Sequence, residues 1–339
     1  MKKIHVRGCG AVSPAGWGAE ALLRAVTGNE VFPHRELKRP GQENPLRVCS
    51  VPPPAARPAF LAHPRLRRSS AITQYALSAS LEALGQDAAL ARAGQCQIGL
   101  VVCVMSGCVN YSRRFYEETL GNPETASPLV FPETVFNAPA SHIAAFLGSS
   151  AINYTLIGGP GAFLQGLALA GEWLTEGRVD GCLVVGSEEI DWLTADALYR
   201  FSKNAVFSEG AGALYLKADP SPGARLEAVT NPHTLNGSGT RAAALQAMRS
   251  ELPPAGPTDL LFDSRRPRAF ASRAETQLWL DRAGPRHSVK AALGEGLMAA
   301  SAWQCVAAAK ALEREAGPAA VVSVAGFTQQ AIAARFTNE

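Results

Sequence analysis

The chain has 339 residues, of which 47% are apolar and 18% are charged, and this composition excludes an intrinsically disordered protein. The net charge is only +3, with 32 Lys and Arg residues against 29 Asp and Glu residues, so nucleic acid is not an expected partner. The seven cysteines form no Cys-x-x-Cys pair and the six histidines are scattered, which argues against a metal site or a disulfide framework.

Short runs rich in Val, Ile and Leu recur along the chain, separated by Gly-containing turns and by Ala- and Leu-rich stretches of helical length. This alternation is typical of an α/β protein. The runs are nearly continuous in apolar residues, as in strands that are covered on both faces. They predict strands over residues 4–7, 98–105, 152–157, 182–186, 212–216, 225–229, 259–262, 320–325 and 331–336.

The two halves of the chain resemble weak copies of each other. Residues 153–161 lead through a glycine-rich turn into a predicted helix over 162–176, and a strand follows. Residues 287–296 lead in the same way into a predicted helix over 297–313, again followed by a strand. The repeat predicts a layered fold with two buried, Ala-rich helices, divided into an N-terminal half (1–218) and a C-terminal half (219–339) that form one compact unit.

No targeting or cofactor signal stands out. The basic N-terminus is not followed by the apolar core of a signal peptide, and no run approaches the roughly eighteen apolar residues of a membrane span. The turn at 8–13 lacks the third glycine of the dinucleotide fingerprint, and no Walker A loop occurs. We therefore expect a reduced, soluble, cytoplasmic protein that needs no cofactor.

The turn at 158–161 is a candidate site, because it feeds a strand into the N-terminus of a predicted helix. A nucleophile gains most there from the helix dipole and from free backbone N–H groups. The turn holds Pro160, which suits the first turn of a helix but supplies no nucleophile. The turn is therefore either a structural elbow or a catalytic elbow that has lost its reactive group.

Several segments together resemble the β-ketoacyl synthase family of the thiolase superfamily, in order along nearly the whole chain. They are residues 1–18, 67–77, 106–107, 153–155, 177–188, 210–213 and 290–300. The resemblance implies the five-layered α-β-α-β-α thiolase fold, an obligate dimer, and acyl chains delivered by an acyl carrier protein.

The same resemblance places the family's catalytic residues on unsuitable side chains. The active cysteine falls on Pro160, the first histidine on Ser264, the second histidine on Glu295 and the conserved glutamate on Gln304, while Lys290 is retained. Claisen condensation needs a thiolate to carry the acyl chain and two imidazoles to assist the decarboxylation. The resemblance therefore implies a chain with no catalytic residues of its own.

Two further departures from the family accompany this loss. The carboxylate of Glu295 would repel developing negative charge, and we expect Lys290 to serve structure alone by pairing with it. The family's gating loop, Gly-Phe-Gly-Gly, is replaced by the sequence Ala-Gly-Phe-Thr at residues 325–328, so its usual gating function is not expected here.

A ketosynthase-like chain without its cysteine is similar to a chain length factor, the non-catalytic partner of a ketosynthase in type II polyketide and aryl-polyene systems. That resemblance implies a heterodimer with a catalytic ketosynthase and an acyl tunnel shared between the subunits, in polyketide, aryl-polyene or fatty-acid-like chain elongation. The tunnel gate would be Val109, Ser112 and Tyr116, which share one face of a helix at i, i+3 and i+7. The alternative for these residues is an ordinary packing face.

The residues leave two other functions open. Cys108 lies beside the gate and could be a relocated nucleophile for acyl transfer or hydrolysis, although a buried, inert thiol is the alternative. The chain could also be an acyl-binding scaffold that forms a homodimer. A basic patch for an acidic carrier protein is a further hypothesis, and its members would be Arg65, Arg67, Arg68, Arg113 and Arg114.

Overall fold

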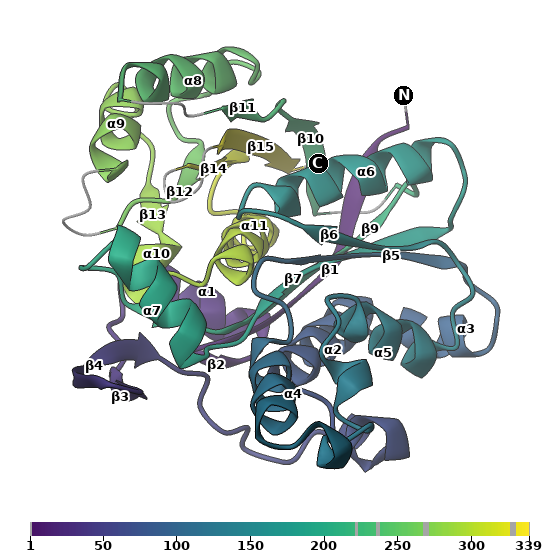
Figure 1. The fold of residues 1–339 in the computed structure, drawn as a ribbon. Coiled ribbons are helices and arrows are strands. Elements are labelled where there is room, and N and C mark those ends of the chain that lie inside the picture. Colours follow the sequence, from purple (N-terminus) through teal and green to yellow (C-terminus); the bar gives the residue numbers. More distant parts are fainter. Residues whose placement is uncertain (1, 221–222, 235–237, 267–270, 326–329, 339) are drawn as a thin grey trace.

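A 12-stranded mixed sheet runs through the computed structural model, which describes residues 2–220, 223–234, 238–266, 271–325 and 330–338 (Figure 1). The N-terminal half contributes β1 (Ile4–Ser13), β5 (Ile98–Val104), β6 (Asn153–Ile157), β7 (Gly181–Glu188) and β9 (Gly210–Lys217). The C-terminal half contributes β10 (Ala224–Val229), β12 (Leu260–Asp263), β13 (Arg286–Ser288), β14 (Ala319–Val324) and β15 (Gln330–Asn338). Each strand predicted from the apolar runs is present.

The strand order repeats between the two halves. The order is β6-β5-β7-β9-β1 in the first set and β13-β12-β14-β15-β10 in the second. In each set the order by chain position is therefore third, second, fourth, fifth, first. The strands in the first three places are parallel, and the strand in the fourth place pairs antiparallel with both of its neighbours. The sets join where β1 pairs with β10, at Ile4 opposite Leu226 and His5 opposite Arg225. This duplication confirms the predicted fold class.

We call the strand set β6-β5-β7-β9-β1 the first sheet and the set β13-β12-β14-β15-β10 the second sheet, although the pairing of β1 with β10 joins them. Helices cover both of these sheets and fill the space between them (Figure 1). They are α1 (Ala19–Thr27), α2 (Ala71–Leu84), α3 (Asp87–Arg92), α4 (Val109–Gly121), α5 (Ala138–Leu147), α6 (Ala162–Thr175), α7 (Trp192–Phe201), α8 (Ser238–Ser250), α9 (Ala271–Leu278), α10 (Val289–Leu293) and α11 (Met298–Glu313). One apolar cluster holds α6 and α11 between the sheets, a second packs α2 and α5 on the outer face of the first sheet, and a third packs α8 and α9 on the outer face of the second. These clusters give five layers.

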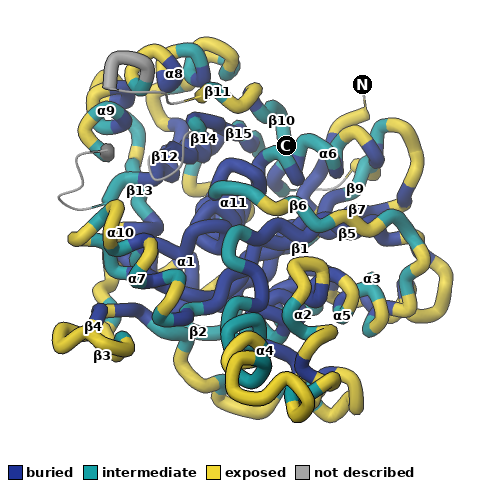
Figure 2. The backbone as a smooth tube through the Cα atoms, viewed as in Figure 1, coloured by how far each residue is buried: buried dark blue, intermediate teal, exposed yellow. Residues whose placement is uncertain are grey.

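The central helix α11 is buried over nearly its whole length (Figure 2). Its small side chains allow close packing: a Cβ atom on Gly186 or Gly212 would lie 2.9 or 2.8 Å from the Cβ of Ala302. The indole Nε1 of Trp303 donates to the backbone oxygens of Val12 and Ala211, at 3.1 and 2.9 Å. Strands from the first half therefore bind a helix from the second.

The prediction that the strands are covered on both faces was wrong for one strand. β6 has no fully buried residue, and Tyr154 and Ile157 are 49% and 59% exposed. The reason is that β6 is the last strand in the sheet order, so one of its edges has no neighbouring strand among the described residues.

Several short elements were not predicted. A separate three-stranded sheet contains β3 (Arg35–Arg39), β4 (Gln42–Cys49) and β8 (Phe207–Ser208), and its first two strands are mostly polar. Short strands β2 (Gly16–Trp17) and β11 (His233–Thr234) flank the large sheet. Single-turn 3-10 helices are η1 (Ala59–Ala62), η2 (Pro64–Leu66), η3 (Pro123–Thr125) and η4 (Phe131–Glu133). No described helix combines the length and the apolar character that crossing a bilayer requires.

Candidate functional site

Pro160 lies in the turn where β6 leads into α6, at the edge where parallel strands of the first sheet end together. Val104 at the end of β5 is paired with Ile157 at the end of β6, and the N–H of Gly158 donates to the oxygen of Val104 at 3.2 Å. Pro160 is buried, and a Cβ on the adjacent Gly161 would come within 2.9 Å of Ile332 in β15. The elbow is thus wedged between the two halves and presents no nucleophilic atom.

Ser264 and Gln304 meet at the end of the second sheet. The Ser264 hydroxyl donates to the oxygen of Ser323 at 2.9 Å and accepts the N–H of Ala325 at 3.1 Å. The amide of Gln304 donates to the same Ser323 oxygen at 3.0 Å and to the oxygen of Phe262 at 3.3 Å. Both side chains are buried and hold strand ends together, so neither is placed as a proton-transfer group.

Lys290 and Glu295 form the ion pair that the sequence analysis expected. The Lys290 Nζ lies 3.0 Å from the Glu295 Oε2, and the two side chains are 1% and 0% exposed. The Nε of Arg266 lies 3.5 Å from the same oxygen. The backbone of Glu295 is also fixed, because its N–H donates to the oxygen of Val206 at 2.7 Å and its oxygen accepts the N–H of Ser208 at 3.0 Å.

Two buried acids, Asp263 and Glu275, lie beside Ser264 and were not predicted from the sequence. Asp263 accepts from the Nε atoms of Arg265 and Arg286 at 2.6 and 2.5 Å. Burial, and then the nearby charge of Asp263, raise the pKa of Glu275 to about 8. Its Oε1 accepts the hydroxyl of Ser323 at 2.6 Å. A carboxylate that directly ends an apolar strand, as Asp263 does, was the available signal.

Two more buried carboxylates, Glu188 and Glu189, fix the N-terminus of α4. Glu188 accepts the N–H groups of Met105 and Ser106 at 2.6 and 3.0 Å, and Glu189 accepts those of Asn110 and Ile72 at 2.8 and 3.1 Å. Burial raises the pKa of Glu188 to about 8 and that of Glu189 to about 7. These acids orient the helix that carries the predicted gate.

The three predicted gate residues lie on α4 in unequal surroundings. The Ser112 hydroxyl lies 3.0 Å from the backbone oxygens of both Cys108 and Thr134, so it serves the local structure. Val109 is half-buried, whereas Tyr116 is 63% exposed. A tunnel wall at Tyr116 therefore requires a second surface over α4, and the gate stays a prediction.

Cys108 precedes α4 and is a poor nucleophile. Its side chain is 1% exposed, and burial raises its pKa to about 12. The hydroxyl of Ser70 is its nearby polar partner, at 3.6 Å from the sulfur. A thiol in this state is almost fully protonated at neutral pH, which disfavours the relocated-nucleophile hypothesis. All seven cysteines are free and buried.

The five arginines proposed as a carrier-protein patch divide into two groups. Arg65, Arg67 and Arg68 are exposed in the segment before α2. The other two form ion pairs with carboxylates: Arg113 with Glu117 at 2.9 Å and Asp191 at 2.7 Å, and Arg114 with Glu118 at 2.8 Å. Their charge is thereby largely offset, and the patch stays a prediction.

Three of the four residues in the altered gating sequence, 326–328, lie outside the described residues. Within the described ranges, no three His, Cys, Asp or Glu side chains are grouped so that they could hold a metal ion.

No family model matches the chain, and no curated protein matches it at the level of sequence. Solved structures do match: "The ishigamide ketosynthase/chain length factor" has a TM-score of 0.81 and 22% identity, with 99% of each chain covered.

A type II acyl carrier protein in complex with its ketosynthase, AntDE:AntF, has a TM-score of 0.81 and 15% identity, with all of each chain covered at 100%. The ketosynthase ApeO in complex with its chain length factor ApeC, from Xenorhabdus doucetiae, has a TM-score of 0.77 and 15% identity over 100% of this chain and 98% of that one. At these identities the likeness concerns the fold. The chain therefore has the thiolase-like fold of the ketosynthase and chain length factor structures over its whole length.

Proposed function

We propose that this chain is a non-catalytic, chain-length-factor-like subunit, which pairs with a catalytic β-ketoacyl synthase and completes an acyl tunnel in polyketide-type, aryl-polyene or fatty-acid-like synthesis. The chemistry would take place in the partner. An acyl carrier protein would deliver the growing chain to the pair.

The observation that carries this proposal is the state of the four family catalytic positions. Pro160 has no nucleophilic atom, Ser264 and Gln304 both bind the oxygen of Ser323, and Glu295 is neutralised by Lys290. A condensing enzyme needs a thiolate and imidazoles that are free to move protons at these positions. The fold is kept while each of these groups is replaced by one with a structural role.

The surface near α4 supports pairing with another subunit. The open edge of β6 exposes Tyr154 and Ile157. Large apolar side chains on α4 and in the segment that follows it are also exposed: Tyr116 by 63%, Leu120 by 69%, Leu129 by 64% and Phe131 by 55%. The end of β6 lies beside the end of β5, and four residues (105–108) separate the end of β5 from the start of α4. The strand edge therefore adjoins the start of this helix. Exposed strand edges and apolar patches of this kind are typical of subunit interfaces.

Three of the matching solved structures agree with this proposal. They are a ketosynthase/chain length factor, a ketosynthase with its chain length factor, and a ketosynthase with its acyl carrier protein. A chain in each of them shares the fold of this chain, so a partner of the same fold could meet the β6 edge and the exposed face of α4. The tunnel would then run beside Tyr116.

Coexpression with ketosynthases from the same genome, followed by native mass spectrometry, tests the proposal. We expect a one-to-one heterodimer with a ketosynthase that retains its cysteine and histidines. The variant Ile157→Asp should abolish it, because the charge would be buried at the interface. Leu280→Asp is the matched control, since Leu280 is 62% exposed just after α9 in the C-terminal half, and this variant should still pair. A stable homodimer that binds no ketosynthase would overturn the proposal and favour the scaffold.

A further inference from the structure

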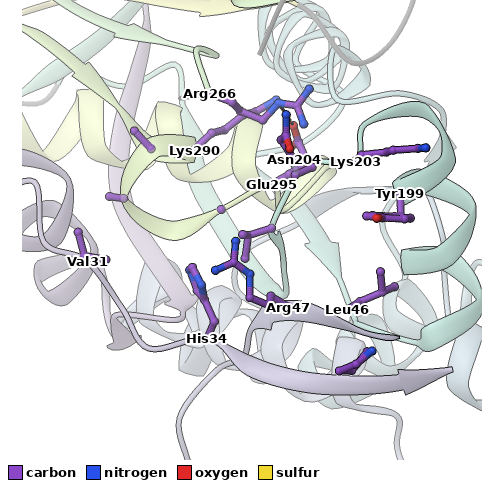
Figure 3. A pocket seen from close by; sticks show the side chains of 16 residues that line it. Val31, His34, Leu46, Arg47, Tyr199, Lys203, Asn204, Arg266, Lys290 and Glu295 are labelled. Atoms are coloured by element: carbon purple, nitrogen blue, oxygen red, sulfur yellow. Dashed lines mark ion pairs between the residues drawn. The ribbon is translucent and has the colours of Figure 1, made fainter. Parts of the chain in front are cut away.

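Two adjoining cavities near Glu295 carry an unusual concentration of positive charge. The first has a volume of about 430 Å³ and is lined by Arg47, Lys203, Arg266 and Lys290, with Glu295 as the one acidic side chain among its described residues (Figure 3). The figure draws Arg47 on one side of this cavity and Arg266 with Lys290 on the other.

The second cavity, of about 610 Å³, continues from the first, since Arg266 and Ala291 line both. Its other basic side chains are Arg265, Arg273 and Arg286, and its described lining holds no acid. We call the two together the cationic cleft. The whole chain has a net charge of only +3, so this cleft concentrates charge that the rest of the chain offsets.

The acids near the cleft neutralise only part of it. Glu295 is held by Lys290 and Arg266, at 3.0 and 3.5 Å. Asp263 takes one bond from each of Arg265 and Arg286, in both cases through Nε rather than the terminal nitrogens.

Arg47 and Lys203 are exposed and form no ion pair with any described residue. They approach the first cavity from β4 and from the loop after α7, so they are far apart in the chain and close in space. Positive charge therefore remains on the walls of a concave site after the internal pairs are formed.

We propose that the cationic cleft binds a small ligand that carries phosphate groups. Guanidinium groups present paired N–H donors that match phosphate oxygens, and a low-dielectric concave wall strengthens such charge-assisted bonds. Cavities of this size are in the range that small ligands occupy. Positive groups that line both cavities favour a ligand with more than one anionic centre, such as a diphosphate. The site lies within one chain and requires no partner subunit, so it goes beyond the proposed function and does not depend on it.

Isothermal titration calorimetry of the full chain with inorganic pyrophosphate tests this site. We expect saturable one-to-one binding that weakens as salt is raised, because the contacts are ionic. The double variant Arg47→Gln/Lys203→Gln should weaken binding at least about tenfold with an unchanged unfolding temperature, since neither side chain forms an internal ion pair. Its charge-matched control is Arg24→Gln/Arg57→Gln, two exposed arginines outside the cleft, which should bind within about twofold of the original chain.

Two further titrations separate the sources of the phosphate. Tighter binding of ADP than of pyrophosphate would identify a nucleotide-type ligand, and the reverse order would identify a free diphosphate; either result supports the site. Equal weakening by both double variants would show general charge attraction, and undetectable binding at millimolar pyrophosphate would show an empty cleft. Either of those results overturns the proposal.

Discussion

The ammonium of Lys290 and the carboxylate of Glu295 lie 3.0 Å apart in a region where neither side chain reaches solvent. Charges buried in this way stabilise a fold only while both are present, because each compensates the desolvation of the other. The nearby guanidinium of Arg266, at 3.5 Å from the same carboxylate, adds a second positive charge. The position where the resemblance places a catalytic histidine is therefore part of the protein's internal support.

Removing one partner of this pair should destabilise the protein. We expect Lys290→Met to lower the free energy of unfolding by about 3 kcal/mol, near the lower end of the range for broken buried pairs because Arg266 remains close to Glu295. Urea denaturation measures the change.

The double variant Lys290→Met/Glu295→Leu provides the control. It leaves no unpaired carboxylate, so it should recover most of the lost stability. Equal losses in the single and the double variant would mean that packing, and not charge pairing, sets the cost.

Tyr116 should limit product length if the tunnel runs beside α4. In the reconstituted pair with a ketosynthase, Tyr116→Ala removes a 63% exposed aromatic side chain from the proposed wall, and the products should become longer. Mass spectrometry of the released chains measures the length. Glu117→Ala is the control on the neighbouring position, which does not share the helix face of Tyr116. Unchanged lengths for Tyr116→Ala would exclude the gate assignment.

Restoring a thiol alone should not restore condensation. Pro160→Cys places a sulfur at the elbow before α6, but Ser264 and Glu295 still stand where the resemblance to ketosynthases places the two histidines. Without imidazoles, the decarboxylation of a malonyl thioester should remain at the level of the original chain. Release of labelled carbon dioxide measures this step. Robust release by the single variant would mean that other groups assist the reaction, and the non-catalytic assignment would fail.

Cys108 should resist alkylation in the folded protein. With its pKa raised to about 12, only about one molecule in 10,000 carries the thiolate at pH 8, against about a tenth for a cysteine that titrates near pH 9. Intact mass after iodoacetamide should show no adduct at this residue until urea is added. Rapid labelling in native buffer would reopen the relocated-nucleophile hypothesis.

The same pKa shift predicts a dependence of stability on pH. The folded chain holds the Cys108 proton up to about pH 12, whereas the unfolded chain releases it near pH 9. The contribution to stability is therefore complete below pH 9 and is lost as the pH rises from about 9 towards 12. Cys108→Ser should reduce this loss, since its hydroxyl does not ionise in that window.

Much of the fold could be predicted from local patterns. Apolar runs located the strands, and the repeated pattern of strand, glycine turn and Ala-rich helix predicted two similar halves. The hairpin of β3 and β4 was missed, because its residues are polar and form a strand pair without apolar alternation. The exposure of β6 was also missed, since the order of strands in a sheet depends on pairing between distant segments.

The candidate site was only partly accessible to sequence reasoning. The Lys290 and Glu295 pair could be predicted because the two residues lie five positions apart. The cationic cleft could not, because Arg47, Lys203 and Arg266 come from three separate segments that only the tertiary fold brings together. The roles of Glu188 and Glu189 depend on backbone N–H groups far away in the chain.

The position of α11 also has a consequence for the order in which the protein is made. This helix is synthesised after the whole N-terminal half, yet its Trp303 binds Val12 in the first strand and its alanines cover part of the inner face of the first sheet. While a ribosome is still translating residues 219–297, that face of the N-terminal half lacks the cover of α11, so the part that α11 packs against in β1, β7 and β9 stays exposed to chaperones and to other nascent chains. A stop codon anywhere before α11 would leave the first sheet permanently half-covered, so truncated chains should be insoluble rather than partly functional.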